Sequence, residues 1–391
     1  MWRLTCTNQP SVVAQPVVCQ SRRAAPLRRA GLSLALSLCA ALVPVELAFA
    51  QGFADPLDTP ALQYAGPLSS LPIQAVAHAG DALLAVGLRG VILRSVDGGQ
   101  HWNQVPAPVS SDLLDVFFVS ATRGWAVGQD GVILASLDGG ASWHKQFDGR
   151  QALEQFSHYY QADAALDAST RDGYLQQIQT NFKAGPVLPF FAVHFVDERN
   201  GLAVGPFGTL VASDDGGEHW RPALQQIDNP DFLHLNAIAQ VGNALFITSE
   251  QGVVFKADAD KRQFRQVATG HQGSFFSIAG HDGVLLAGGL AGALYASHDA
   301  GETWAPLHTP LTQLVTRIVY DPAQRQFLAV SAGGEALALA ADLGRFAPLG
   351  PRAAMLYTDV AGLPGRTLFA GIQGLRQERA VNMQAQRGEQ Q

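Results

Sequence analysis

Four copies of a Ser-x-Asp-x-Gly-x-x-Trp element place a carboxylate close to a hydroxyl group, and such groups could do chemistry. Recurring carboxylates suggest either acid–base catalysis or calcium binding. Four equivalent copies spread around a repeat architecture, however, cannot converge on one substrate. We therefore interpret them as structural turns in which Asp accepts backbone N–H groups, Gly adopts a positive φ and Trp packs between units. The copies are Ser95-Asp97-Gly99-Trp102, Ser136-Asp138-Gly140-Trp143, Ser213-Asp215-Gly217-Trp220 and Ser297-Asp299-Gly301-Trp304.

These turns belong to a longer repeat that begins with a Val-Gly-x-x-Gly element. The second glycine of that element lies twelve residues before the closing aromatic, as from Gly131 to Trp143. Seven such anchor glycines are spaced by 41, 77, 44, 40, 42 and 40 residues, so the long interval contains an insertion. The anchors are Gly90, Gly131, Gly208, Gly252, Gly292, Gly334 and Gly374.

Each unit has the pattern of four short strands. In the second unit these cover 113–119, 124–128, 131–136 and 143–146, which are apolar or aromatic runs bounded by Gly, Asp and Ser. Four strands in about 40 residues are typical of one propeller blade. We therefore predict an all-β fold: a seven-bladed β-propeller with four-stranded antiparallel blades over residues 73–379.

The two ends of the ring lead to a prediction about its closure. Residues 51–72 form an extended, proline-containing segment, and Ile73, aligned with Leu114, opens the first blade. The seventh unit has no fourth strand of its own. We expect residues near 61–65 to supply it, which would remove two exposed sheet edges. Residues 380–391 are polar and are predicted to be a disordered tail.

Residues 1–50 have the features of an export signal. Arginines precede an apolar run from Gly31 to Val45, and Ala48 and Ala50 fit a cleavage site before Gln51. The alternative is an uncleaved membrane anchor, but a run of about 15 residues is shorter than the roughly 20 that span a bilayer. We expect a signal peptide and a periplasmic location, or the thylakoid lumen if the host is photosynthetic.

Composition limits the partners. The chain has 26 Lys and Arg residues and 33 Asp and Glu residues. Residues 1–50 contain five of the basic residues and one of the acidic ones, so cleavage would leave 21 basic and 32 acidic residues, a net charge of −11. This balance argues against nucleic acid or anionic lipid as the main partner. All three cysteines lie in the leader, and the histidines lack metal-binding spacing. We expect no cofactor, no metal and, after cleavage, no membrane span in a monomeric protein.

Residues 150–186 depart from the repeat and predict a helical hairpin. Apolar residues recur at helical spacing on both sides of a break at 169–173. The insertion joins the last strand of one blade to the first of the next, so it lies on the face of the Val-Gly-x-x-Gly loops. It is either a packing cap for the ring or a docking element with Phe156, Tyr159 and Tyr160 as aromatic anchors.

Short loops on the same face offer two further candidates for partner contacts. Phe207 is an aromatic residue in one loop, and Arg89 lies in the equivalent loop of the first unit. Loops on a rigid scaffold often carry binding function. Phe207 and Arg89 therefore join the three aromatic residues of the insertion as predicted partner-binding residues.

The repeat resembles known families. The acidic turn resembles the Asp-box, or BNR repeat, of sialidases and related propellers. Gly124-Trp125-Ala126-Val127-Gly128, followed by the Gly131 strand and the Asp138 turn, resembles the Ycf48/Hcf136 family of photosystem II stability and assembly factors. This resemblance implies a non-catalytic scaffold that binds a membrane-protein complex or its assembly intermediate, such as a photosystem subunit or an envelope transporter.

A sialidase-like glycoside hydrolase is the alternative, because those enzymes also carry Asp-boxes. Such an enzyme needs an arginine cluster, a Tyr–Glu nucleophile pair and an acid. Arg123 and Arg199 lie at equivalent positions before Gly124 and Gly201, which indicates a role in turns, and no Tyr–Glu pair stands out. We therefore predict that the chain is not an enzyme. The arginines considered are Arg89, Arg123, Arg199, Arg317 and Arg366.

Overall fold

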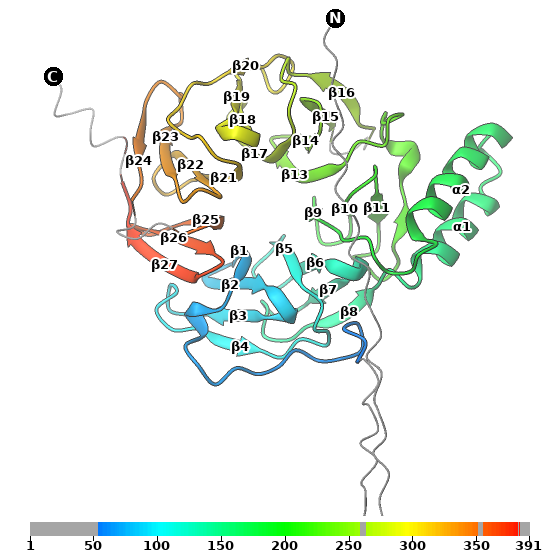
Figure 1. The fold of residues 1–391 in the computed structure, drawn as a ribbon, viewed down its shortest axis with the longest axis horizontal. Coiled ribbons are helices and arrows are strands. Elements are labelled where there is room, and N and C mark those ends of the chain that lie inside the picture. Colours follow the sequence, from blue (N-terminus) through cyan, green and yellow to red (C-terminus); the bar gives the residue numbers. More distant parts are fainter. Residues whose placement is uncertain (1–53, 259–262, 351–354, 382, 384–391) are drawn as a thin grey trace, which may run out of the picture. The chain divides into compact units, whose positions relative to one another are not determined.

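The computed structural model describes residues 54–258, 263–350, 355–381 and 383. The predicted signal peptide at 1–50 and the end of the predicted tail, 384–391, lie outside the described residues. The compact unit Gly52–Gln391 forms seven antiparallel sheets arranged in a ring (Figure 1). This confirms the predicted seven-bladed propeller. No helix in the described ranges is both long and apolar enough to cross a membrane.

Six of the seven sheets have four strands, and each sheet follows chain order from the centre of the ring outward (Figure 1). The first blade contains β1 (Ile73–Ala79), β2 (Ala82–Gly87), β3 (Ile92–Ser95) and β4 (Asn103–Val105). The second contains β5 (Leu113–Phe118), β6 (Gly124–Gly128), β7 (Ile133–Ser136) and β8 (His144–Phe147). The third contains β9 (Ala192–Phe195), β10 (Gly201–Val204), β11 (Leu210–Ser213) and β12 (Arg221–Pro222). The fourth contains β13 (Leu235–Val241), β14 (Ala244–Ser249), β15 (Val253–Asp258) and β16 (Arg265–Ala268). The fifth contains β17 (Phe275–His281), β18 (Val284–Gly289), β19 (Leu294–Ser297) and β20 (Ala305–Pro306). The sixth contains β21 (Val315–Asp321), β22 (Gln326–Ser331), β23 (Ala336–Ala340) and β24 (Phe346–Pro348). The seventh is β25 (Tyr357–Leu363), β26 (Arg366–Gly371) and β27 (Gly374–Arg379).

The core lies between neighbouring blades. All five residues of β6 are buried, because both faces of this strand are covered. Leu84 of the first blade packs in one apolar cluster with Val116, Ala126 and Trp143 of the second. The Asp-box tryptophan therefore fills the space between two sheets, as predicted. The connections among the described residues also contain five short 3-10 helices: η1 (Leu68–Ser70), η2 (Leu88–Gly90), η3 (Gln129–Gly131), η4 (Leu224–Gln226) and η5 (Leu290–Gly292).

The two faces of the ring carry different loops. On one face, each loop between the second and third strands meets the connection that leads into the same blade. Gln129 N donates to Asp112 O, and Ile372 N donates to Leu356 O. The helical insertion belongs to this face, since Gly149 N donates to Asp130 O. We call it the hairpin face, and we call the opposite face, which carries the Asp-box turns, the turn face.

The insertion forms two helices, α1 (Ala152–Ala162) and α2 (Ala168–Phe182), beside the third blade (Figure 1). The predicted break at 169–173 is wrong, because the turn lies at 163–167. The Asp167 side chain accepts the Thr170 N–H at 3.0 Å, which caps α2 and starts this helix before the predicted break. Gly173 thus lies inside a helix.

The predicted closing strand is also wrong. The seventh sheet contains only β25, β26 and β27 among the described residues. Residues 61–65 instead follow the outer strand of the first blade, where the Gln104 side chain accepts from Tyr64 N at 2.8 Å and donates to Leu62 O at 2.7 Å. The ring closes through inner strands: Asp359 Oδ2 accepts Val76 N at 2.9 Å across 283 residues of chain.

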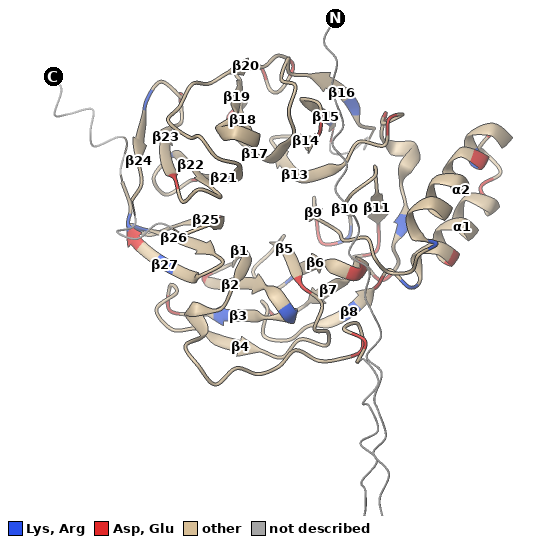
Figure 2. Cartoon of the chain, in the orientation of Figure 1, with Lys and Arg blue, Asp and Glu red and all other residues tan. Residues whose placement is uncertain are grey.

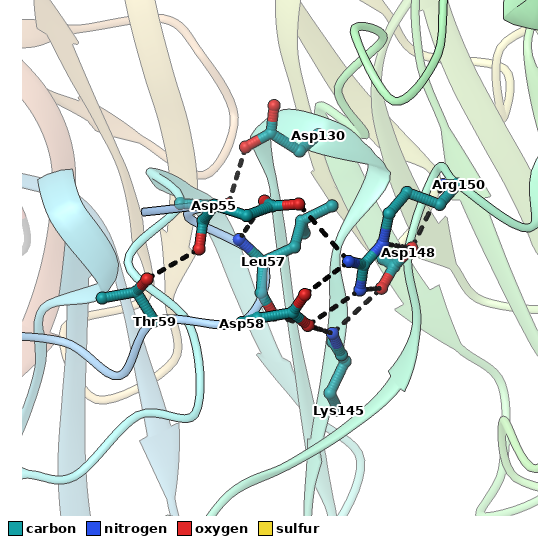
Figure 3. Close-up of polar contacts among 9 residues, drawn as sticks. Asp55, Leu57, Asp58, Thr59, Asp130, Lys145, Asp148 and Arg150 are labelled. Carbon is teal, nitrogen blue, oxygen red and sulfur yellow. Dashed lines mark hydrogen bonds and ion pairs between the residues drawn. The ribbon is translucent and has the colours of Figure 1, made fainter. Parts of the chain in front are cut away.

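Two terminal segments pack on the ring. At the C-terminal end Met383 is 2% exposed, and its carbonyl accepts from Arg345, so the ordered chain extends past the predicted boundary at 379. At the N-terminal end an ionic cluster ties the first described residues to the second blade. We call it the N-terminal clasp (Figure 3), and it consists of Asp55, Asp58, Lys145, Asp148 and Arg150.

Candidate functional site

The Asp-box turns are self-contained. Ser95 Oγ donates to Asp97 Oδ1 at 2.7 Å, Gly99 N donates to Ser95 Oγ at 2.9 Å, and His101 N donates to Asp97 Oδ1 at 3.0 Å. The other three turns repeat these bonds. The His101 and Ser95 hydrogen bonds hold the pKa of Asp97 well below its usual range. Carboxylates used in this way are acceptors within a turn and are poor proton donors.

The arginines of the hydrolase alternative do not come together. Arg123 and Arg199 donate to the carbonyls of Gly216 and Asp214, both in the third Asp-box turn. Arg89, by contrast, is exposed on the hairpin face, where its backbone N–H donates to Asp112. In the part of the chain that the structure describes, no group of three His, Cys, Asp or Glu could hold a metal ion.

Two of the predicted aromatic anchors belong to the core. Phe156 and Tyr160 are 1% and 0% exposed. Phe156 stacks on Phe147 of the second blade at 5.5 Å, while the Tyr160 hydroxyl donates to Gln225 and accepts Leu224 N. The structure contradicts a docking role for both and supports the packing-cap interpretation. The apolar stripe turns inward because the second blade offers an aromatic surface to cover.

Tyr159 and Phe207 remain accessible. Tyr159 is half-buried, with the Arg221 guanidinium 6.0 Å from its ring. Phe207 is 48% exposed, and α2 holds its loop because Gln177 donates to the Phe207 carbonyl at 3.0 Å. A positive φ of 53° turns this residue outward, a conformation that side chains other than Gly, Asn and Asp rarely adopt. The helical insertion therefore supports an exposed aromatic loop.

Phe207 is one of several large apolar residues exposed on the hairpin face. Three lie in loops between second and third strands, and three lie in connections that lead into inner strands. We call the set the apolar rim: Val187, Phe207, Phe232, Leu290, Leu356 and Ile372. Scattered apolar residues on a surface are normal, and Val96 and Leu137 are exposed on the turn face as well. The hairpin face has six of them, which makes it the candidate interaction surface.

At the centre of this face lies a cavity of about 340 Å³, lined by the inner strands of all seven blades. β-bulges create its wall. In six blades the pairing of the two inner strands skips one residue, as between Leu113 and Asp115, and the extra residue turns toward the opening. We call this cavity the channel mouth. The six bulge residues and Phe191 of the third blade form its ring: Gln74, Leu114, Phe191, Asn236, Phe276, Thr316 and Thr358.

Three charged residues lie just behind that ring, and we call them the channel cluster: Asp115, Arg317 and Asp359. Arg317 Nε lies 3.1 Å from Asp359 Oδ1, and a terminal nitrogen of Arg317 lies 3.7 Å from Asp115 Oδ1. Asp115 Oδ2 accepts Val193 N at 3.1 Å, as Asp359 Oδ2 accepts Val76 N. Each aspartate therefore joins its blade to the next and also faces the cavity.

The cluster was not predicted from the sequence. Its members lie up to 244 positions apart, although they occupy the same position of the repeat, directly after the bulge. The predicted alignment of Ile73 with Leu114 is displaced by one residue, since strand pairing makes Ile73 equivalent to Leu113. A comparison of charges at each repeat position, in the correct register, would have found the cluster.

The fold and site define the class of the protein: a seven-bladed β-propeller with an apolar rim and a charged central mouth on one face. The sequence model of "Photosynthesis system II assembly factor YCF48" matches residues 95–166 and 168–340, more than half of the chain. The chain therefore belongs to this family, in agreement with the resemblance seen in its repeats. No curated protein matches the sequence.

Solved structures agree on the fold. A structure described as YCF48 bound to D1 peptide has 14% sequence identity and a TM-score of 0.57, covering 82% of this chain and 99% of its own. YCF48 from Cyanidioschyzon merolae has 14% identity and a TM-score of 0.55, covering 81% and 98%. A computationally designed protein, Ika8, has 13% identity and a TM-score of 0.52, covering 80% and 88%.

Proposed function

We propose that this chain is an exported, non-catalytic scaffold that binds a segment of a membrane-protein client on its hairpin face and assists assembly of the complex. The apolar rim around the channel mouth is the observation that carries the proposal. Membership of an assembly-factor family supports it, and so does the D1 peptide bound to the YCF48 structure of the same fold. The predicted leader supports a periplasmic or lumenal location.

The hairpin face suits a peptide or loop. Its six rim residues lie on four blades of a closed ring. Binding therefore does not require the scaffold to become ordered first, and ordering is a cost that lowers the affinity of mobile surfaces. Phe207 and Phe232 are both 48% exposed and lie on neighbouring segments of the third and fourth blades. Burying two such rings contributes on the order of 3 kcal/mol. These two aromatic residues are therefore the anchors to test.

The test is capture of the client from membranes of the exporting host by chemical crosslinking. F207N/F232N removes both rings and suits the positive φ of 53° at each position. V96N/L137N is the matched control, because Val96 and Leu137 are exposed on the turn face. We expect the first variant to lose the captured client by about tenfold or more and the control to retain it. Equal capture by both variants would refute binding through the hairpin face.

Deletion of the hairpin, residues 152–182, would be a poor test of docking. Phe156 of the hairpin stacks on Phe147, which also packs against Phe190, and all three belong to one core cluster. Loss of the hairpin would therefore expose core surface. An unfolded product is the expected result. Point substitutions on the rim separate binding from folding, which the deletion cannot do.

A further inference from the structure

One buried oxygen atom in the channel cluster has no hydrogen-bond partner. Asp115 is 6% exposed, and its Oδ2 accepts Val193 N. Its Oδ1 makes no hydrogen bond of standard geometry among the described residues. The neighbouring Val116 N–H interacts with the carboxylate without meeting that geometry, and the nearest cation, a terminal nitrogen of Arg317, is 3.7 Å away. That separation is beyond hydrogen-bond range. A buried carboxylate oxygen without a donor is unfavourable.

Arg317 cannot serve both aspartates. Its Nε is held by Asp359 at 3.1 Å, and the oxygens of Asp359 also accept Val76 N and Val360 N. One guanidinium therefore faces two carboxylates, and His234 is the remaining titratable group that lines the cavity. His234 itself lies 3.9 Å from Glu250. The cluster therefore has one more carboxylate than cations, and Asp115 Oδ1 lacks a hydrogen-bond donor of standard geometry.

Three of the seven ring residues at the mouth are apolar, and the other four are polar and uncharged. Leu114, Phe191 and Phe276 are half-buried in the wall of the mouth. Such a wall suits the methylene stem of a long basic side chain, which can lie along apolar surface while its head reaches a charged partner. A free inorganic cation or a small acidic ligand would gain nothing from these three side chains.

We infer that the channel mouth is a recognition pocket for one basic side chain, a lysine or arginine of an extended client segment, whose cationic group donates to Asp115 Oδ1. This inference rests on the proposed function and adds to it the chemistry of the segment: apolar residues for the rim and one cation for the mouth. Phosphate-like or acidic segments are disfavoured, because the two carboxylates of the cluster outnumber its guanidinium.

Binding of a cation in the channel mouth is expected to depend on pH through the Asp115 carboxyl. Burial raises the pKa of the Asp115 carboxyl to about 6. A bound cation favours the ionised carboxylate, so binding is expected to weaken as the pH falls below about 6 and Asp115 takes up a proton. The other charged or titratable groups around it are Arg317, Asp359 and His234, as described above.

The test uses the full mature chain and capped pentapeptides, acetyl-Ala-Leu-Lys-Leu-Ala-amide and its norleucine and glutamate analogues. The readout is the NMR amide resonance of Val193, whose N–H donates to Asp115. We expect the lysine peptide to shift this resonance in a saturable way, and the analogues to bind at least about tenfold more weakly. Equal binding of the lysine and norleucine peptides would overturn the inference without any mutation.

Substitution gives a second readout. D115N removes the charge but keeps an acceptor for Val193 N, and D112N makes the same change in a loop of the hairpin face. The lysine peptide is expected to lose at least about tenfold in affinity for D115N and to retain its affinity for D112N. Loss with both variants would show non-specific attraction to an acidic surface and would overturn the pocket.

The two proposals fail in different ways. If D115N still captures the client while F207N/F232N does not, the hairpin face binds the client and the cationic pocket is wrong. If the lysine peptide binds at Asp115 but no client is captured from membranes, the pocket is real and the scaffold function is wrong.

Discussion

Two ionic clusters of this protein have the same charge balance but different structures. The N-terminal clasp contains three carboxylates and two cations, and the channel cluster contains two carboxylates and one cation, so each has one excess negative charge. In the clasp, Arg150 bonds Asp58 at 2.6 and 3.0 Å and Asp148 at 2.8 and 3.1 Å (Figure 3). In the channel cluster, one carboxylate oxygen has no donor.

The difference teaches that excess charge does not identify a site. Lys and Arg lie beside Asp and Glu in many parts of the ring (Figure 2). The clasp is partly open to solvent, with side chains 37% exposed at Arg150 and 60% at Asp58, and its carboxylates have several partners. A buried carboxylate oxygen without a partner is less common: among the described residues only Asp115 Oδ1 and Asp321 Oδ2 are of this kind. Asp115 is the one of the two that also lines the central cavity. The following variants test whether the clusters differ in the way described.

The largest effect is expected from Arg317→Met. It leaves Asp115 and Asp359 buried without a cation, and loss of one partner from a buried pair costs about 3 kcal/mol. Urea unfolding should show this loss at pH 8. The loss should be smaller at pH 5, because the raised pKa of Asp115 leaves its carboxyl largely protonated at that pH. Arg366→Met, at the exposed first residue of β26, is the control. An equal loss at both pH values would contradict electrostatic coupling in the cluster.

The next effect is the pH dependence of Asp115 itself. Its folded-state pKa is about 6 and its ordinary value is 3.8, so between these values the folded state binds the proton more tightly. Stability of the natural chain relative to D115N should therefore fall as pH rises from about 4 to about 6 and then level off, by about 2 kcal/mol. Thermal unfolding of both proteins at several pH values measures this. A relative stability that rises with pH would contradict the assignment.

Arg150→Ala should have a smaller effect that depends on salt. Because the clasp is partly exposed, its loss is expected to cost about 1 kcal/mol at low ionic strength and less in 1 M NaCl, where screening is stronger. The sites between Asp55 and Thr59 should also become cleavable by protease. If the loss is as large in 1 M NaCl, the clasp acts through packing, and the contrast with the channel cluster weakens.

The smallest effect is expected from Asp138→Ala. It removes acceptors for Ser136 and Ser142 in one of four equivalent turns, so the Tm should fall by only about 2 °C. Client capture should not change, since this turn lies on the turn face. Loss of capture at unchanged Tm would show that the Asp-box has a binding role.

Repetition made the architecture predictable. The spacing of the anchor glycines gave seven blades, and the second blade has strands within two residues of the predicted ranges. The site was harder to predict, because it arises from positions where the repeats differ. Whether Phe156 faces solvent or core depends on the surface that Phe147 presents, and whether Asp115 has a donor depends on a few tenths of an ångström between blades.

The three-stranded seventh blade has a consequence for how the ring is completed. Among the described residues, this sheet contains only the last three strands of the chain, and no residue from the N-terminal side joins it. The contact between the last blade and the first is made by Asp359, whose Oδ2 accepts Val76 N. Because Asp359 also belongs to the channel cluster, one side chain both closes the ring and lines its central cavity.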